Sequence, residues 1–337
     1  MKNVKVISSI FLSGILGVFL TGCKSVSEPP ANAQVFAVLT AQNAQVTRDA
    51  SVTIQSLDAA AASDGKGAVT VNNIYTPTGV SGTDITFSQG GSVTFENTDL
   101  YSARGNSFVL AKPAVTTVIG GTTFTTTQVL VVGGARRGMQ YGDYGYWREN
   151  TVATGAFTGS YANWAPFVIF DPANASANVP TTDNTNYTFS GRMLGGLDLY
   201  DVSNKLVETD EVTGDITVNV NFRTNKLSGT MAFFVNDMPW YTGAITSTGG
   251  VQTTDDSFAG TITLNESSYS GRLAVTSGSG AGYNTALTGQ FLGKSGQIPA
   301  EAVGQFNIIC NPGSVNNFGG EGLGFRPEVY GSFGVKR

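Results

Sequence analysis

The stretch Ile216–Phe222 reads ITVNVNF, so apolar residues alternate with Thr and Asn along its whole length. Successive side chains of a β-strand point to opposite faces of a sheet. The apolar residues of this stretch therefore share one face, and the polar residues share the other. The pattern predicts a strand with one buried face and one solvated face.

Similar runs lie on both sides of this stretch through the second half of the chain, with Gly, Asn or Asp in the turns between them. No segment shows a sustained helical period. Many short strands at near-even spacing favour a closed antiparallel barrel, because closure removes exposed sheet edges. The predicted strands of this half are Tyr187–Leu194, Ile216–Phe222, Leu227–Phe234, Trp240–Ile245, Phe258–Leu264, Ser268–Val275, Ala286–Leu292, Ala302–Ile309 and Val329–Val335.

The first half of the chain is also predicted to be rich in strands. Thr116–Ile119 and Thr122–Val132 are separated by Gly120-Gly121, which predicts a hairpin. Ala59–Ala62 is either a single helical turn or a loop. The remaining predicted strands are Gln34–Leu39, Ser51–Leu57, Ala68–Ile74, Ile85–Phe87, Ser92–Phe95 and Phe108–Leu110.

Composition excludes several classes of function. The chain has no histidine, which removes the commonest general base and the commonest metal ligand. With 19 basic and 24 acidic residues it has a net charge of −5 and no basic cluster, so we expect no nucleic-acid binding. Of the two cysteines, Cys310 lies in an apolar run and is expected to be a small buried side chain.

The stretch Met139–Phe170 is the most aromatic part of the chain. One interpretation is an aromatic ligand-binding surface, since Tyr and Trp dominate binding hot spots. The other is a seam where two β-domains pack, with the rings in its core. We favour the seam, because aromatic residues are more often buried than exposed. The Pro- and Asn-rich stretch Asp171–Asn184 then predicts a linker.

The N-terminus predicts an export signal. Lys2 and Lys5 precede the apolar run Ile10–Leu20, which is too short to span a bilayer. Leu20-Thr21-Gly22-Cys23 follows and resembles the lipobox of bacterial lipoproteins. The resemblance implies cleavage between Gly22 and Cys23 and acylation of Cys23, which anchors the protein in a membrane. No Asp follows Cys23, and this favours the outer membrane.

Alternation alone does not separate a barrel in water from a barrel in a bilayer, because both have the same period. Barrels of the outer membrane usually finish on an aromatic residue, whereas this chain ends Val335-Lys336-Arg337. A barrel that spans the membrane would not need a lipid anchor either. We therefore expect a soluble barrel with a packed interior.

The second half of the chain resembles the barrel domain of transferrin-binding protein B and related surface lipoproteins. The resemblance covers Tyr141–Arg337. It departs from the family at Gly304-Gln305-Phe306, where many relatives have two glycines, and at the insert Asn307–Phe325. The similar motifs are Tyr144-Gly145-Tyr146-Trp147, Pro180-Thr181-Thr182 with Tyr187–Gly191, Leu227-Ser228-Gly229-Thr230, Leu287–Gly293 with Pro299–Phe306, and Gly331–Arg337.

This resemblance implies an all-β protein in which a β-rich handle precedes a C-terminal eight-stranded antiparallel barrel. The expected division of the chain is a signal peptide at 1–22, a lipidated tether at 23–32, the handle at 33–140, an aromatic strand region and linker at 141–184, and the barrel at 185–337. In relatives, exposed loops carry binding. The corresponding candidates are Leu197–Val212, Asn236–Trp240, Gly278–Gly282 and Asn311–Pro327.

No catalytic or metal-binding constellation is found, so no enzyme activity, cofactor or metal is expected. Asp255-Asp256 and the group Glu208, Asp210 and Glu211 are read as solvated turns rather than as cation or acid–base sites. We expect an outer-membrane, surface-exposed lipoprotein that binds a host protein, haem or a small solute. It would reach the surface through an outer-membrane translocator. The alternative is a structural or adhesive envelope lipoprotein with no soluble ligand.

Overall fold

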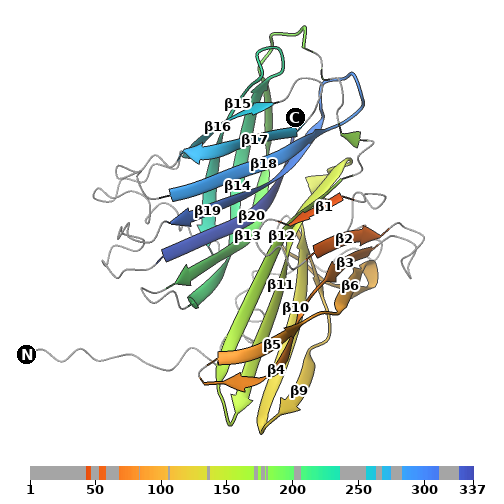
Figure 1. Cartoon of the computed structure of the whole chain (residues 1–337). Helices are drawn as coiled ribbons and strands as arrows, with labels where there is room; N and C mark the ends of the chain where they lie inside the picture. Colours follow the sequence, from red (N-terminus) through yellow and green to blue (C-terminus); the bar gives the residue numbers. More distant parts are fainter. Residues whose placement is uncertain are drawn as a thin grey trace, which may run out of the picture.

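The computed structural model describes residues 43–46, 53–57, 68–82, 84–104, 107–134, 137–170, 174–175, 179, 181–200, 206–235, 256–262, 268–274, 283–310 and 326–337. These ranges consist of antiparallel strands, their turns and short 3-10 segments, among them the helix η2 (Asn97–Asp99). A closed barrel lies at one end of the molecule, and a long twisted sheet extends from it to the other end (Figure 1). Among the described residues, no helix has the length and hydropathy needed to cross a membrane.

The long sheet has seven strands in the order β1-β12-β11-β10-β8-β7, with β9 paired to the first half of β10. We call it the N-terminal sheet. Its longest strands are β10 (Thr122–Val132), β11 (Gly142–Gly155) and β12 (Gly159–Phe170), which also hold the predicted hairpin and the aromatic stretch. The others are β1 (Asn43–Val46), β7 (Leu100–Arg104), β8 (Ser107–Ala111) and β9 (Val115–Ile119).

Two smaller sheets complete the N-terminal part. The first contains β2 (Thr53–Leu57), β3 (Ala68–Asn72) and β6 (Ser92–Glu96). Val69, Val71 and Phe95 from this sheet pack against Trp147, Phe167 and other residues on one face of the N-terminal sheet. The second small sheet pairs β4 (Tyr75–Ser81) with β5 (Asp84–Gln89).

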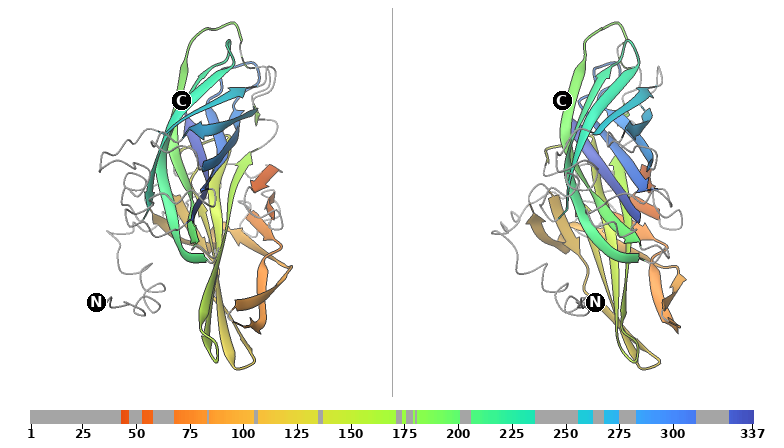
Figure 2. Two further views of the ribbon diagram at one scale, coloured as in Figure 1. Left: turned by 60° about the vertical axis from the view of Figure 1, so that its left-hand side comes forward. Right: turned by 90° about the vertical axis from the view of Figure 1, so that its left-hand side faces the viewer.

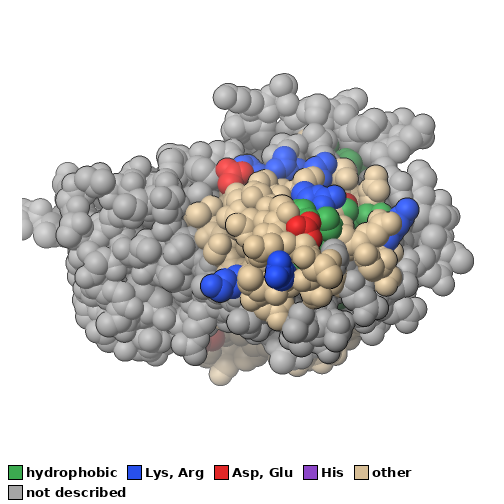
Figure 3. All heavy atoms as spheres, turned by 90° about the horizontal axis from the view of Figure 1, so that it is seen from above, with side chains coloured by type: hydrophobic (Ala, Val, Ile, Leu, Met, Phe, Trp, Pro, Cys, Tyr) green, Lys and Arg blue, Asp and Glu red, His purple; other side chains and the backbone are tan. Residues whose placement is uncertain are grey.

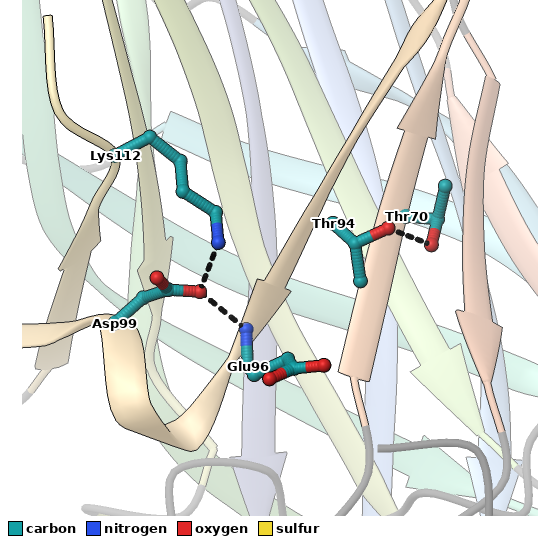
Figure 4. A network of polar contacts seen from close by, with 5 residues as sticks. All are labelled: Thr70, Thr94, Glu96, Asp99 and Lys112. Atoms are coloured by element: carbon teal, nitrogen blue, oxygen red, sulfur yellow. Dashed lines mark hydrogen bonds and ion pairs between the residues drawn. The ribbon is translucent and has the colours of Figure 1, made fainter. Parts of the chain in front are cut away.

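The turn η2 joins β6 to β7 and is fixed by one carboxylate. Asp99 accepts a hydrogen bond of 2.7 Å from the backbone N–H of Glu96 and forms an ion pair of 2.6 Å with Lys112 (Figure 4). Thr70 and Thr94 share a hydrogen bond of 2.9 Å across β3 and β6. Each of these polar side chains therefore serves the local structure.

The second half of the chain forms the predicted closed barrel of eight strands, in which each strand pairs with the next and β20 pairs back with β13. The eight-stranded fold is thus confirmed. The strands are β13 (Tyr187–Tyr200), β14 (Leu206–Asn221), β15 (Lys226–Val235), β16 (Asp256–Ile262), β17 (Ser268–Ala274), β18 (Tyr283–Leu292), β19 (Glu301–Cys310) and β20 (Arg326–Lys336).

The alternating stretch in β14 faces the barrel interior with its apolar residues. Ile216, Val218 and Phe222 are buried in one cluster with Phe291 and Phe333 from the opposite wall. The intervening polar positions are half-buried or, for Asn221, buried with amide hydrogen bonds to the 184–186 turn. An apolar interior is the orientation expected of a barrel in water rather than in a bilayer.

Some sequence-based predictions are wrong in detail. Leu197–Val212 was expected to be an exposed loop, but Leu197 pairs with Asp210 within the β13–β14 ladder, so both strands are longer than their hydrophobic alternation suggests. Asp210 and Glu211 therefore lie on a strand and not in a turn. Asp256 likewise begins β16, and the end of the predicted loop Asn311–Pro327 belongs to β20.

Other predictions lie outside the described residues. These are the signal and Cys23, the strands Gln34–Leu39 and Trp240–Ile245, the segment Ala59–Ala62, the loops 236–240 and 278–282, and most of 311–325. The domain limits 33–140, 141–184 and 185–337 remain predictions. By strand pairing, β11 and β12 belong to the N-terminal sheet.

Candidate functional site

The aromatic stretch packs on both faces of the N-terminal sheet. Trp147 and Phe167 face the small sheet, whereas Tyr144, Tyr146 and Trp164 face the barrel. Both faces are closed, since Tyr144, Trp147 and Trp164 are at most 1% exposed. This contact of β11 and β12 with β13, β19 and β20 is called the seam below, and Figure 2 shows the two parts side by side. The seam interpretation is therefore confirmed for Tyr144, Tyr146 and Trp164, whereas Trp147 and Phe167 belong to the core of the N-terminal part.

Glu301, at the start of β19, connects the two sides of the seam through its carboxylate. One oxygen accepts the backbone N–H of Gln140 at 2.6 Å, and the other accepts those of Tyr141 and Gly142 at 2.9 and 3.2 Å. Burial raises the pKa of Glu301, and the three N–H donors act in the opposite direction. One side chain of the barrel thus satisfies three consecutive backbone donors at the entry to β11.

Two further barrel side chains bond to strand carbonyls of the sheet. The amide Nε2 of Gln305 donates to the carbonyl oxygen of Pro166 at 3.1 Å, and the hydroxyl of Ser332 donates to that of Gly145 at 2.7 Å. Both contacts are buried. They fix β19 and β20 in one register against β11 and β12.

Gly145 shows how closely the strands approach at the seam. A Cβ atom at this position would lie 1.8 Å from the carbonyl oxygen of Val131 and 2.9 Å from the ring of Phe167. We expect Gly145→Ala to lower the free energy of unfolding by about 2 kcal/mol, because a packed backbone must shift. Urea denaturation measures the loss, and Gly120→Ala, at an open turn position, shows the cost of strained φ alone. Equal losses in the two variants would contradict this account.

Two acids of β14, Asp210 and Glu211, lie close enough to Arg148 of the seam to affect its pKa. Arg148 stacks over the ring of Trp164 at 4.4 Å. Burial lowers the pKa of Arg148, and the charges of Glu211, Asp210 and Asp198 oppose that shift. These acids thus contribute to the electrostatics of the seam. Within the part of the chain that the structure describes, no group of acids and cysteines is arranged to hold a metal ion.

Phenylalanine side chains fill the interior of the barrel in the part that the structure describes. Phe291 lies between Phe189 and Phe222, with ring centroids 5.4 and 5.2 Å away. Phe306 and Phe333 complete the cluster and are at most 1% exposed. The described part of the barrel interior is therefore packed with aromatic side chains.

A row of polar side chains is buried on the N-terminal sheet, on the face that carries Trp147. Gln128, Glu149 and Asn163 lie opposite one another on β10, β11 and β12. Glu149 is 0% exposed, and its Oε2 accepts a hydrogen bond of 2.9 Å from Gln128. Its Oε1, the Oε1 of Gln128 and the Nδ2 of Asn163 have no protein partner. Burial raises the pKa of Glu149 to about 7.

The β4–β5 hairpin covers this polar row. The backbone N–H of Tyr75 donates a hydrogen bond to Glu149. The ring of Tyr75 lies 6.1 Å from that of Phe87 and 6.0 Å from that of Tyr161, and Phe87 and Tyr161 are 4.4 Å apart. The three rings pack against one another and form a cover over the polar row.

Exposed large apolar side chains among the described residues all lie on the N-terminal part. They are Val80, Tyr101, Val115 and Val118, which are 37, 58, 64 and 67% exposed. Val80 on β4 and the two valines on β9 belong to strands that lie near each other at the end away from the barrel. Among the described residues seen from the barrel end, Lys and Arg stand at several points and apolar side chains occupy a small area (Figure 3). Sequence reasoning missed this distribution, because single valines in a Thr-rich strand give no signal of exposure.

Comparison with known proteins returns solved structures only. No family model and no curated protein matches the chain. It is similar to intact Ap-TbpB with its N and C lobes at 15% identity and a TM-score of 0.35, covering 86% of this chain and 52% of the other. It is also similar to single and double mutants of the vaccine antigen Transferrin Binding Protein B from Haemophilus parasuis Hp5, at 14 and 13% identity, with TM-scores of 0.34 and 0.35. Each of these two matches covers 88% of this chain and 54% of the mutant chain. The chain thus spans about half the length of these proteins.

Proposed function

We propose that this chain is a lipid-anchored protein of the outer membrane that binds a host protein at the cell surface without catalysis. The observation that carries the proposal is the distribution of exposed apolar side chains. Val80 on β4 and Val115 and Val118 on β9 belong to strands at the end of the molecule away from the barrel, whereas no large apolar side chain of the described barrel surface is exposed to this degree. Exposed apolar surface on a soluble protein favours contact with another macromolecule.

The filled barrel supports a macromolecular ligand over haem or a small solute. Small ligands are usually enclosed in a concave site that buries most of their surface. The rings of Phe189, Phe222 and Phe291 occupy the described levels of the interior. Transferrin, the protein for which the compared structures are named, is one host protein to test.

The seam supports a role as a rigid platform. Glu301, Gln305 and Ser332 connect the barrel to the N-terminal sheet through buried hydrogen bonds. A partner that contacts both parts would then meet a preformed surface, and little conformational entropy would be lost on binding. Such a platform needs no moving part to capture its ligand.

The Cys23→Ser variant tests the anchor and the location together. We expect wild-type protein to take up radiolabelled palmitate and to sediment with outer membranes, and the variant to lose both properties, because two or three acyl chains supply the membrane affinity. A protease cleavage site inserted in residues 278–282 should be cut when protease is added to intact cells, while a periplasmic control protein stays intact. Protection of the site until the outer membrane is opened would refute surface exposure.

The binding surface is tested with Val115→Ser/Val118→Ser in the lipidated full chain. Cells that display wild type should retain iron-loaded transferrin or another host serum protein, and the variant should retain at least about tenfold less, as for loss of an apolar hot spot. Thr288→Ser, at an exposed barrel position, is the matched control. Equal retention by all three proteins would refute this surface as the binding site.

A further inference from the structure

The strand β9 (Val115–Ile119) has an outer edge without a strand partner among the described residues. It pairs with β10 alone. In Figure 1 it lies on the outer side of β10, at the end of the molecule away from the barrel. Val115 and Val118 lie on opposite faces of the strand and are 64 and 67% exposed, so both faces are open to solvent.

The turn before β10 fixes which backbone groups face outward. Gly120 and Gly121 have φ angles of 58° and 78°, the two positive values of a type I′ turn. Such a turn makes its flanking residues, Ile119 and Thr122, a hydrogen-bonded pair. Bonded and non-bonded pairs alternate along an antiparallel ladder, so Thr117 and Val115 also bond to β10.

The outward groups are therefore the N–H and C=O of Thr116 and Val118. Both residues lie in non-hydrogen-bonded pairs with β10, opposite Thr125 and Thr123. Their backbone donors and acceptors point away from the sheet. The free edge thus offers two evenly spaced donor–acceptor sets to another strand.

Some other strands near sheet edges, though not β1 or β2, carry features that discourage pairing. The β7 strand has a register shift between Leu100 and Ser102, and the β4–β5 hairpin has one between Pro77 and Gly79. Bulges, prolines and charges are the usual protections of an edge. The strand β9 has a regular register and the sequence VTTVI, so it has none of these protections.

We propose that the outer edge of β9 pairs antiparallel with β9 of a second copy of this chain, on a two-fold axis at Thr117. In this register Thr116 of each copy faces Val118 of the other. These are the residues whose backbone groups point outward, so two hydrogen-bonded pairs form at once. A symmetric contact must be self-complementary, and an uncharged strand opposes its copy without like-charge repulsion.

The contact is small, and this determines how it would operate. A five-residue strand buries far less than the roughly 1,000 Å² that a stable interface needs. We therefore expect weak pairing that becomes populated when copies are concentrated, as on a membrane. The pairing goes beyond the proposed function, because it uses the backbone edge of β9 and leaves the side chains on both faces of the strand free to contact a host protein.

Disulfide trapping of the full chain tests the register. At the two-fold axis the two Thr117 residues form a non-hydrogen-bonded pair with Cα atoms about 4.5 Å apart, within the range of a disulfide. The two Thr116 residues are diagonal to each other at about 7–8 Å, beyond that range. Thr117→Cys and Thr116→Cys change the same residue type at two exposed positions of one strand.

Under mild oxidation we expect Thr117→Cys to form a dimer at least about tenfold faster than Thr116→Cys, both in detergent and in cell envelopes. The unsubstituted chain, which carries Cys23 and Cys310, is the blank. Equal rates, or no Thr117→Cys dimer at the highest concentration reached, would overturn the proposal. A Thr117→Cys adduct with the mass of a different protein would overturn it too and would identify a foreign strand as the occupant.

Discussion

Replacing Glu301 with Ala is expected to lower the free energy of unfolding by about 3–5 kcal/mol, because the change leaves buried donors without acceptors. The carboxylate accepts the backbone N–H groups of Gln140, Tyr141 and Gly142. Glu301 is 4% exposed, so water does not replace the lost oxygens without a rearrangement of the seam. Urea denaturation followed by tryptophan fluorescence measures the loss, since Trp147 and Trp164 lie in the adjoining strands.

Two comparison variants separate this cause from a general loss of packing. Glu301→Gln keeps the shape and one acceptor but directs an NH₂ group at a backbone donor, so about half of the effect is expected. Ser332→Ala removes a single seam hydrogen bond and should cost about 1 kcal/mol. If Glu301→Ala cost no more than Ser332→Ala, the three short contacts would not be holding the barrel to the sheet.

The barrel was predictable because its strands obey a period of two and turn on Gly, Asn and Asp. The alternation of Ile216–Phe222 predicted that its apolar residues share one face, and the structure places that face in the barrel interior. The ends of the strands were not predictable. Leu197–Val212 reads as a polar loop because acids interrupt its alternation, yet Asp210 and Glu211 pair with Leu197 and Gly196 in the ladder. Their charges act on Arg148 of another sheet, and that interaction is not encoded locally.

The buried polar side chains were also beyond sequence reasoning. Glu301 sits two residues after a proline and looks like a surface acid until the three N–H groups of another part of the chain are placed around it. Glu149 follows Trp147 and Arg148 and reads as the polar side of a strand, yet the β4–β5 hairpin covers it. Both cases depend on contacts between residues far apart in sequence, which periodicity cannot reveal.

Glu149→Gln is expected to stabilise the protein by up to about 3 kcal/mol at pH 8 and to have little effect near pH 4. The pKa of Glu149 is raised from 4.5 to about 7 by burial. Between these values the folded chain keeps a proton that the unfolded chain has released. The free energy of unfolding of wild type therefore falls as the pH rises from 4.5 to 7, and the loss is complete above 7.

The groups around Glu149 give this carboxyl no counter-charge. On β10 and β12 it meets the neutral amides of Gln128 and Asn163, and on β4 it meets the backbone N–H of Tyr75. The titration therefore reflects removal of the carboxylate from water, and a glutamine of the same shape removes the charge without a cavity.

The measurement is the difference in the free energy of unfolding between Glu149→Gln and wild type at each pH from 4 to 8, by urea denaturation. This difference isolates one carboxyl from the 24 acids of the chain. Asp84→Asn removes an exposed carboxyl on the covering hairpin, and we expect its curve to follow wild type within about 0.5 kcal/mol. A difference that does not vary with pH would mean that the carboxyl keeps its water in the folded protein. The β4–β5 hairpin would then not form a closed cover over the polar row.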